Sequence, residues 1–197
     1  MTSATHTNHL HESAPASPHS LGNRVMRVIW GLVQGSLFRL SPRPMHRWRV
    51  LLLKLFGADV QMSSRVYPKA SIWAPWNLKM GDRATIADDV DCYCVDKIIL
   101  GDRVVVSQYS YLCGATHDFE LRHRPLVPRP IFIGEGTWIA ADVFVAPGVT
   151  IGEESVIGAR SSVFGDLPAW KICTGSPAKP VRDREIREAE SLPEAGA

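Results

Sequence analysis

The sequence carries no strong charge of either sign. Its 22 basic and 20 acidic residues leave a formal net charge of +2 over 197 residues. The body of the chain has no run rich in lysine and arginine with interleaved aromatic residues. A protein that binds nucleic acid needs a concentrated positive field to hold the phosphates. The composition therefore argues against nucleic acid as a partner.

Cysteines are also few, and none of them has the CxxC spacing of a metal or redox motif. The four are Cys92, Cys94, Cys113 and Cys173. The chain opens without an apolar segment followed by a small-residue cleavage site, so no secretory leader is predicted. Both absences favour a reducing compartment, and we expect a cytoplasmic protein.

The two ends hold little that could build a core. Residues 1–20 contain hardly a large apolar residue, which predicts a disordered tail. Residues 183–197 are rich in charge and predict a short helix or tail. The irregular spacing of the histidines in the first tail does not predict a metal site; they are His6, His9, His11 and His19.

The middle of the chain follows neither the period of a helix nor that of an ordinary strand. Aliphatic residues recur at every sixth place instead, and a small residue often follows them, as Gly134 and Gly152 do. In a triangular solenoid each flat side takes one such hexad, and the small residue turns the corner. We therefore predict an all-β core, a left-handed parallel β-helix of about four to five coils over residues 57–182. The hexads begin at Met80, Ile86, Cys92, Leu100, Val106, Leu112, Ile133, Ile139, Val145, Ile151, Ile157 and Val163.

The hexads are interrupted most strongly between Leu112 and Ile133. Residues 114–130 carry no hexad pattern, and we expect an extended surface loop, the usual place for binding and catalysis. His117 lies at its root, where a neutral imidazole could take a proton near pH 7. Asp118, Glu120 or a backbone carbonyl could fix its tautomer. A loop histidine taken alone is more often a solvated surface residue.

A second interruption follows an acidic cluster. The interval from Cys92 to Leu100 is longer than one hexad. Carboxylates accept hydrogen bonds from adjacent sugar hydroxyls, so the cluster is a candidate acceptor site. A solvated outer corner is the equal alternative. The cluster consists of Asp88, Asp89 and Asp91.

Residues 21–56 form a basic segment without a single acidic residue. Residues 25–40 and 45–56 are predicted to form two amphipathic helices, separated by prolines at 42 and 44. Neither apolar run reaches the ~20 residues that span a bilayer. Such helices could lie on an anionic membrane surface through residues 24–56, could cap the open end of the β-helix, or could do both.

Four motifs in order give the chain a family resemblance. They are THD (116–118), PIFIGEGTWIAADVFVAPGVTIG (130–152), IGARSSV (157–163) and GSPAKPVR (175–182). Together they resemble the hexapeptide-repeat acyltransferases. With WRVLLLKLFGADV (48–60) and APWNLKMGD (74–82), the chain more narrowly resembles the colanic acid biosynthesis acetyltransferases, relatives of galactoside and maltose O-acetyltransferases. The likeness covers roughly residues 24–184.

The resemblance implies a homotrimer with active sites between adjacent solenoids. His117 would be the general base that deprotonates a sugar hydroxyl, which attacks acetyl-CoA directly; no metal is implied. Trp138 would lie near the histidine and the pantetheine arm, with Ala141 and Ala159 at turns that meet the pantetheine. Contacts to the coenzyme phosphates would come from Lys179 and Arg182. Candidate acceptor contacts are Asp88, Asp89, Asp91 and Asp118.

Two departures weaken this transfer of roles. Ala87 stands where galactoside O-acetyltransferases have an asparagine that holds the acceptor sugar. Phe164, Gly165 and Asp166 replace a Thr-Lys-Asp sequence, which removes a basic residue near the coenzyme, and Arg160 is the candidate to compensate. The acceptor, a sugar or lipid-linked oligosaccharide at the inner face of the membrane, is therefore expected only by class.

Two other functions are open to this fold. A γ-class carbonic anhydrase needs three histidines on zinc, and outside the tail only His46, His117 and His123 exist. A catalytically silent solenoid that serves as an assembly scaffold is the second alternative.

Overall fold

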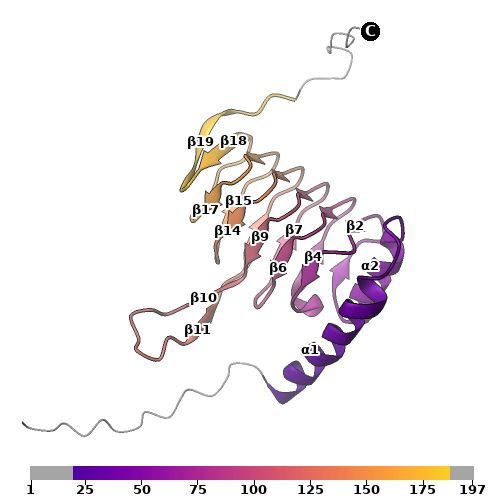
Figure 1. Ribbon diagram of the computed structural model, residues 1–197. Helices are drawn as coiled ribbons and strands as arrows, with labels where there is room; N and C mark the ends of the chain where they lie inside the picture. The colour runs from indigo at the N-terminus through magenta and orange to yellow at the C-terminus, as the bar shows by residue number, and fades with distance from the viewer. Residues whose placement is uncertain (1–19, 187–197) are drawn as a thin grey trace, which may run out of the picture.

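Three flat sheets wind around one aliphatic interior in this chain. The structure is a computed structural model, and it describes residues 20–186. The chain forms a left-handed parallel β-helix with helices over one end and a long hairpin that projects from one side (Figure 1). The tail expected at 1–20 lies outside the described residues except for Ser20.

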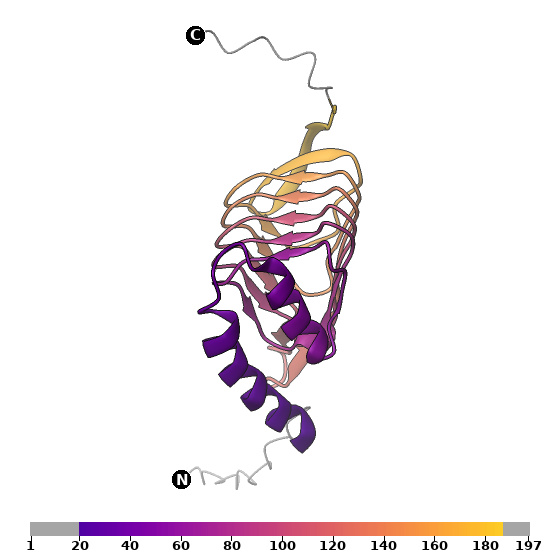
Figure 2. The same cartoon turned by 90° about the vertical axis from the view of Figure 1, so that its right-hand side faces the viewer.

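Each sheet collects one side of every coil (Figures 1 and 2). The first sheet contains β1 (Asp59–Val60), β4 (Leu78–Met80), β7 (Ile98–Leu100), β12 (Ile131–Ile133) and β15 (Thr150–Ile151). The second contains β2 (Arg65–Val66), β5 (Thr85–Ile86), β8 (Val105–Val106), β13 (Trp138–Ile139), β16 (Val156–Ile157), β18 (Lys171–Gly175) and β19 (Ala178–Asp183). The third contains β3 (Ser71–Ile72), β6 (Asp91–Tyr93), β9 (Tyr111–Cys113), β14 (Phe144–Val145) and β17 (Ser162–Val163).

The hexad residues line the interior as the repeat predicts. All twelve aliphatic or cysteine positions named above are at most 2% exposed. The degenerate stretch before Met80 adds one coil through Val60, Val66 and Ile72, which are equally buried. Five coils are complete, and a partial sixth follows. The six-residue repeat does not predict this partial coil, because its first inward residue, Leu167, follows Val163 at a shorter interval than six residues. Leu167 forms a parallel bridge with Ile151.

Glycine is required at the corner between the first and second sheets because the next coil passes very close. A Cβ built on Gly134 would lie 2.4 Å from the Glu153 nitrogen, and one on Gly152 would lie 2.3 Å from the Ala169 nitrogen. Real Cβ atoms do not approach a backbone this closely. The small residue of the hexad is therefore fixed by coil stacking.

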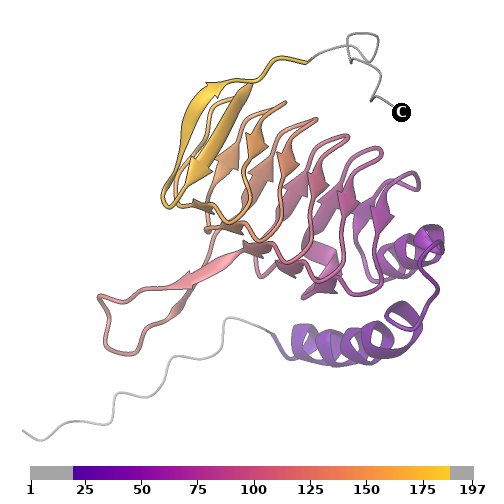
Figure 3. The same ribbon diagram turned by 45° about the horizontal axis from the view of Figure 1, so that its top comes forward.

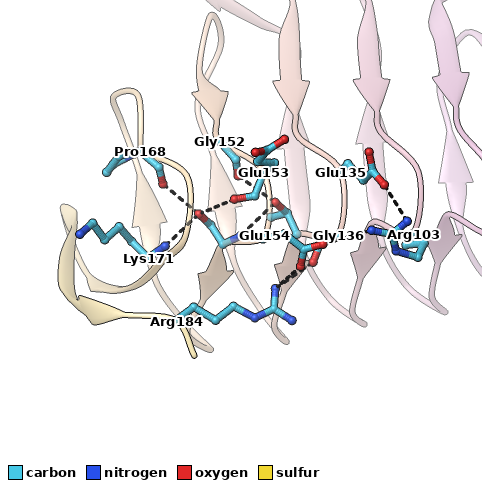
Figure 4. Close-up of polar contacts among 11 residues, drawn as sticks. Arg103, Glu135, Gly136, Gly152, Glu153, Glu154, Pro168, Lys171 and Arg184 are labelled. Atoms are coloured by element: carbon cyan, nitrogen blue, oxygen red, sulfur yellow. Dashed lines mark hydrogen bonds and ion pairs between the residues drawn. The ribbon is translucent and has the colours of Figure 1, made fainter. Parts of the chain in front are cut away.

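Charged side chains tie neighbouring coils together near the same corner (Figure 4). Arg103 contacts Glu135 at 2.6 Å and Glu154 at 3.1 Å. Arg184, which follows β19, lies 3.1 Å from the same Glu154 and donates to the Gly136 carbonyl. These groups are partly solvated, so each pair contributes little alone. Together they hold the segment after β19 against the solenoid wall.

The helices cover the first coil. α1 (Leu21–Val33) continues as a short π-helix, η1 (Gln34–Phe38), and α2 (His46–Leu55) follows the proline-containing link; a 3₁₀ turn, η2 (Pro75–Asn77), lies between β3 and β4. One side-chain donor reaches each side of the first coil. Lys54 donates to the Val60 carbonyl (3.0 Å), Arg49 to that of Val66 (2.6 Å) and Trp30 to that of Ile72 (2.6 Å).

Arg49 is the anchor of this arrangement. Its side chain is fully buried, and its guanidinium also donates to the Ser41 hydroxyl and to the carbonyls of Pro42 and Arg43. Burial lowers the pKa of Arg49. Because backbone oxygens and a hydroxyl satisfy it, the guanidinium fixes the link between α1 and α2 onto β2.

The C-terminal end differs from the expected short helix. Residues 184–186 are not helical, and the strand β19 precedes them. β19 pairs antiparallel with β18, so the GSPAKPVR segment forms a hairpin on the last coil. The remaining residues of the expected helix or tail lie outside the described part of the chain.

The corner geometry predicts a sharp glycine requirement. We expect Gly134→Ala to destabilise the protein by about 2 kcal/mol, because the added methyl overlaps the next coil's backbone. Gly165→Ala is the matched control, since nothing lies within 4 Å of its Cβ position. The measurement is the midpoint of urea unfolding. Equal midpoints for the two variants would contradict this account of the corner.

Candidate active site

The interruption at residues 114–130 is an antiparallel hairpin. β10 (Ala115–His117) pairs with β11 (Leu126–Pro128). The hairpin leaves the third sheet after β9 and returns to the first sheet at β12, so it projects from the corner between these sheets (Figures 1 and 3). It carries an exposed His117 at the end of β10.

The His117 ring is held by a backbone carbonyl. Its Nδ1 lies 2.6 Å from the Arg124 oxygen. A carbonyl only accepts, so Nδ1 carries the proton in this bond, and the neutral ring keeps a lone pair on Nε2. Arg124 has a left-handed φ of 43°. Of the three partners that the sequence offers, the carbonyl is the one that contacts the ring.

Asp118 has a different place in the hairpin. Its carboxylate accepts from the Glu120 backbone N–H at 3.0 Å, and its own N–H donates to the Pro125 carbonyl at 3.0 Å. Both bonds shape the turn. The structure therefore gives Asp118 a local partner, and its role as an acceptor contact stays a prediction.

Several predicted residues line up along the corner between the second and third sheets. The Arg160 N–H donates to the Ala141 carbonyl, and the Asp142 N–H donates to the Gln108 carbonyl, both at 3.0 Å. Ala159 is exposed on the same corner. The Arg160 guanidinium lies 3.5 Å from the Asp142 carboxylate in an exposed pair, so part of its charge is already compensated.

Trp138 lies beside this corner on the outer face of the second sheet. It pairs with Val105 on one side and Val156 on the other, and its side chain is 48% exposed. The indole N–H donates to the Ser107 hydroxyl at 2.9 Å. This bond fixes the indole and leaves the Ser107 O–H as a donor.

A hollow of about 490 Å³ adjoins Trp138 on the side of the first coils. Asp88 and Asp89 line it, together with Ala87, Ser107 and Thr85. Ala87 gives this lining a methyl group and no side-chain hydrogen-bonding group. Its remaining polar lining includes Tyr67, Lys69, Gln108 and Tyr109.

The acidic cluster is divided by the structure. Asp88 accepts from the Lys69 backbone N–H at 3.1 Å and lies 3.3 Å from the Arg43 guanidinium, so it also has a structural role. Asp91 lies instead on the third sheet, in register with Tyr111, and desolvation raises its pKa. The chain turns the corner between Asp89 and Asp91, and Asp91 is not part of the hollow's lining.

The two remaining predicted residues lie at the far end of the second sheet. Lys179 pairs with Thr174 and Arg182 with Ile172 in the β18–β19 hairpin. With strands ~4.8 Å apart, the four steps from β5 to β18 span ~19 Å. Asp88, Asp89 and the predicted coenzyme residues therefore follow one line along the second sheet and its corner with the third, whereas Asp91 and Asp118 lie away from it.

The structure does not bring His117 to that line within one chain. The second sheet is the side of the triangle opposite the corner from which the hairpin projects. His117 and Trp138 of one chain thus lie on different sides of the solenoid. The sequence offered a backbone carbonyl for His117 without identifying it as that of Arg124, and it did not single out Ser107. Ser107 could have been found from the repeat, because it places a hydroxyl at the position that Ala87, Ala140 and Gly158 occupy in other coils.

The histidines are not arranged as a metal site. Among residues 20–186, no group of three or more His, Cys, Asp or Glu side chains is placed to hold a metal ion. His46 contacts the Val66 carbonyl and packs on Tyr67, with ring centroids 4.9 Å apart. Burial lowers the pKa of His46. The zinc site of a carbonic anhydrase is therefore not assembled in the described part of the chain.

The chain is similar in sequence to known acetyltransferases. The family model "Bacterial transferase hexapeptide (six repeats)" matches residues 130–165. An Escherichia coli K12 protein named "Putative colanic acid biosynthesis acetyltransferase WcaF" is 47% identical over 163 residues, which cover 83% of this chain and 90% of the relative. A fission yeast protein named "Putative acetyltransferase" is 34% identical, covering 77% of this chain and 75% of its own length.

Two solved structures share the fold over most of the chain. A hexapeptide-repeat acetyltransferase from Vibrio cholerae, crystallised with acetyl coenzyme A, has a TM-score of 0.74 at 25% identity and covers 85% of this chain and 91% of its own. A galactoside acetyltransferase in complex with coenzyme A has a TM-score of 0.71 at 27% identity, with 86% of each chain covered.

The His117 geometry predicts an uncommon tautomer. Neutral His117 should carry its proton on Nδ1, because the Arg124 carbonyl accepts from that nitrogen. Nitrogen-15 shifts of the ring at high pH report this directly, with His117→Asn to assign the signal. A neutral ring protonated on Nε2 would mean that the 2.6 Å contact does not exist in solution.

Proposed function

This chain belongs to the hexapeptide-repeat acyltransferases, and from that premise we propose that it transfers an acetyl group from acetyl-CoA to a sugar hydroxyl. The chain is an acetyltransferase by its relatives, of which the 47% identical one is named for colanic acid biosynthesis. The observation that carries the finer proposal is the His117 ring, which is exposed and is held through Nδ1, so that Nε2 keeps its lone pair as a base.

The reaction is a direct transfer within a ternary complex. Nε2 of His117 takes the proton of the acceptor hydroxyl while its oxygen attacks the thioester carbonyl carbon. The new C–O bond forms first, and the C–S bond of the tetrahedral intermediate then breaks. The proton on His117 passes to the departing thiolate, so the ring returns to its neutral state. No acyl-enzyme is required.

The line of residues along the second sheet is the proposed coenzyme site. Trp138 supplies an apolar face for the pantetheine arm, and its hydrogen bond to Ser107 keeps that face in place. Ala141 and Ala159 leave the corner open for the arm. Lys179 and Arg182 lie at the far end, where two exposed cations favour the coenzyme phosphates. Arg160 lies between these parts of the groove.

The site is completed by a neighbouring copy in a homotrimer. One chain holds His117 at one edge of the third sheet and the coenzyme groove at the other edge. The third sheet between them carries a continuous row of aromatic side chains, with successive ring centroids 5.4–6.3 Å apart. Aromatic rows of this kind suit a protein interface. The row consists of Trp73, Tyr93, Tyr111, Phe144 and Phe164.

The hollow beside Trp138 is the proposed acceptor site. Asp88 and Asp89 accept hydrogen bonds from sugar hydroxyls, and Ser107 donates one. The acceptor is a sugar, free or on a lipid-linked oligosaccharide, at the cytoplasmic face of the membrane during surface polysaccharide synthesis. A silent scaffold would have no use for a histidine held in one tautomer, so the enzyme is the better interpretation.

Removal of the base should abolish most of the turnover. We expect His117→Ala to lower kcat by about 10²- to 10⁴-fold, the usual contribution of a general base, with the KM for acetyl-CoA nearly unchanged. His123→Ala, in the same hairpin, is the matched control. Turnover is followed by release of free thiol with a sugar acceptor. Normal kcat in a correctly assembled His117→Ala protein would exclude this mechanism.

Mixed assemblies test whether the site is shared between chains. Ala159→Trp should block the coenzyme groove, so it is inactive by a different route from His117→Ala. When equal amounts are unfolded and refolded together, about one quarter of the interfaces should join an intact His117 to an intact groove in a closed trimer. Activity should therefore return to about a quarter of the wild-type value. A mixture as inactive as its components would place the whole site in one chain.

A further inference from the structure

α1 turns its apolar side away from the solenoid. Its outward stripe is 57% to 78% exposed, although a surface helix normally buries such a stripe. The inward side of α1 and of its continuation η1 is partly polar: Gln34 accepts from the Ile72 N–H at 3.1 Å, and the Arg27 guanidinium lies 4.4 Å from the centre of the Trp73 ring. The stripe consists of Leu21, Val25, Val28 and Leu32.

α2 adds further exposed apolar residues next to the end of η1. The Trp48 indole donates to the Leu37 carbonyl at 3.0 Å, which joins the end of η1 to α2. An apolar hollow of about 300 Å³ marks this junction. We call the combined surface the end face. It comprises the α1 stripe together with Leu37, Leu40, Met45, Trp48, Leu51 and Leu55, all of them exposed.

The charge on this face has one sign. Arg24, Arg39 and Arg47 are exposed among the apolar residues, and residues 13–58 contain no acidic side chain. Within residues 20–186, none of these three arginines forms an ion pair with a carboxylate. Two copies of the face would bring like charges together. An anionic surface with an apolar layer beneath it complements both properties.

We propose that the end face rests in the headgroup layer of an anionic lipid bilayer. Basic residues beside apolar ones, with tryptophan among them, are the features of an interfacial helix. Among the described residues, 20–186, no helix has the length and hydropathy of a membrane span. The helices lie at the end of the solenoid opposite β18 and β19 (Figures 1 and 2).

This orientation also sets the distance of each part of the proposed site from the bilayer. Arg43, in the link between the helices, lines the acceptor hollow, whereas Lys179 lies at the far end of the second sheet. The acceptor therefore enters close to the bilayer, and the coenzyme phosphates remain in the aqueous phase. This step alone rests on the proposed function; the membrane contact does not.

Flotation of the full chain with vesicles tests the contact. Vesicles of phosphatidylcholine alone are compared with vesicles that also contain phosphatidylglycerol. We expect binding at least about tenfold stronger with the anionic lipid, weakened by added salt. Binding that is absent, or equal for both vesicles at every salt concentration, would overturn the proposal.

Matched variants show which residues make the contact. Val28→Ser/Leu32→Ser should lower binding about tenfold, because two apolar side chains are lost from the lipid. Phe132→Ser/Val181→Ser, exposed apolar residues elsewhere, should leave it unchanged. Arg24→Gln/Arg39→Gln/Arg47→Gln should remove the preference for anionic lipid, whereas Arg83→Gln/Lys97→Gln/Arg122→Gln should retain it. Equal binding by both members of either pair would contradict the assignment.

Two measurements distinguish the lipid contact from self-association and from the catalytic proposal. Sedimentation should give the same number of chains per assembly for Val28→Ser/Leu32→Ser and wild type; a smaller assembly would mean that the face joins copies, and the lipid proposal would fail.

His117→Ala should float like wild type. Normal flotation with normal turnover in His117→Ala would refute the catalytic proposal alone, whereas lost flotation with normal chemistry on a soluble sugar would refute the membrane contact alone.

Discussion

Backbone pairing between successive coils is the interaction on which the rest of this molecule depends. Each strand is two or three residues long over most of the solenoid, too short to persist by itself. Its N–H and C=O groups are satisfied only by the coils above and below. That requirement brings Gly134 to within a van der Waals contact of the next backbone and stacks like side chains into an aliphatic interior. It also confines every insertion to a corner, where the ladder of hydrogen bonds is not broken.

The insertion at residues 114–130 shows what this confinement means for function. The hairpin replaces no strand, so the interior remains continuous from Leu112 to Ile133. Its antiparallel pairing supplies an independent support that places the Arg124 carbonyl against the His117 ring. The groove on the second sheet has the opposite character, because its parts are fixed directly by coil stacking. A rigid wall and a projecting hairpin thus divide the proposed chemistry between them.

Most of the fold was predictable because the solenoid interior depends on local spacing. Six-residue intervals mark the inward positions within each run of hexads. The coil count was missed because the last step, from Val163 to Leu167, is shortened. The site was predictable where it broke the repeat, as at His117. The site was less predictable where it depends on the register between coils. Trp138 and Ser107 form a hydrogen bond across two neighbouring coils although 31 positions separate them. The sequence does not show this pairing, because the hairpin insertion lengthens the interval between these coils. Asp88 and Asp91 are close in the sequence and were therefore predicted to share one site. In the structure they lie on opposite sides of a corner, which the sequence does not reveal.

The three donors over the first coil have a consequence for assembly. A parallel solenoid that ended in bare carbonyls would be a template on which further strands add, and repeated addition would give fibres. Trp30, Arg49 and Lys54 occupy one acceptor on each side of that coil. The helices therefore act as a chain terminator for end-to-end polymerisation. Loss of Arg49 would expose the Val66 carbonyl at this end of the solenoid. Its first effect would be filament growth from that end, while the aliphatic interior stayed the same.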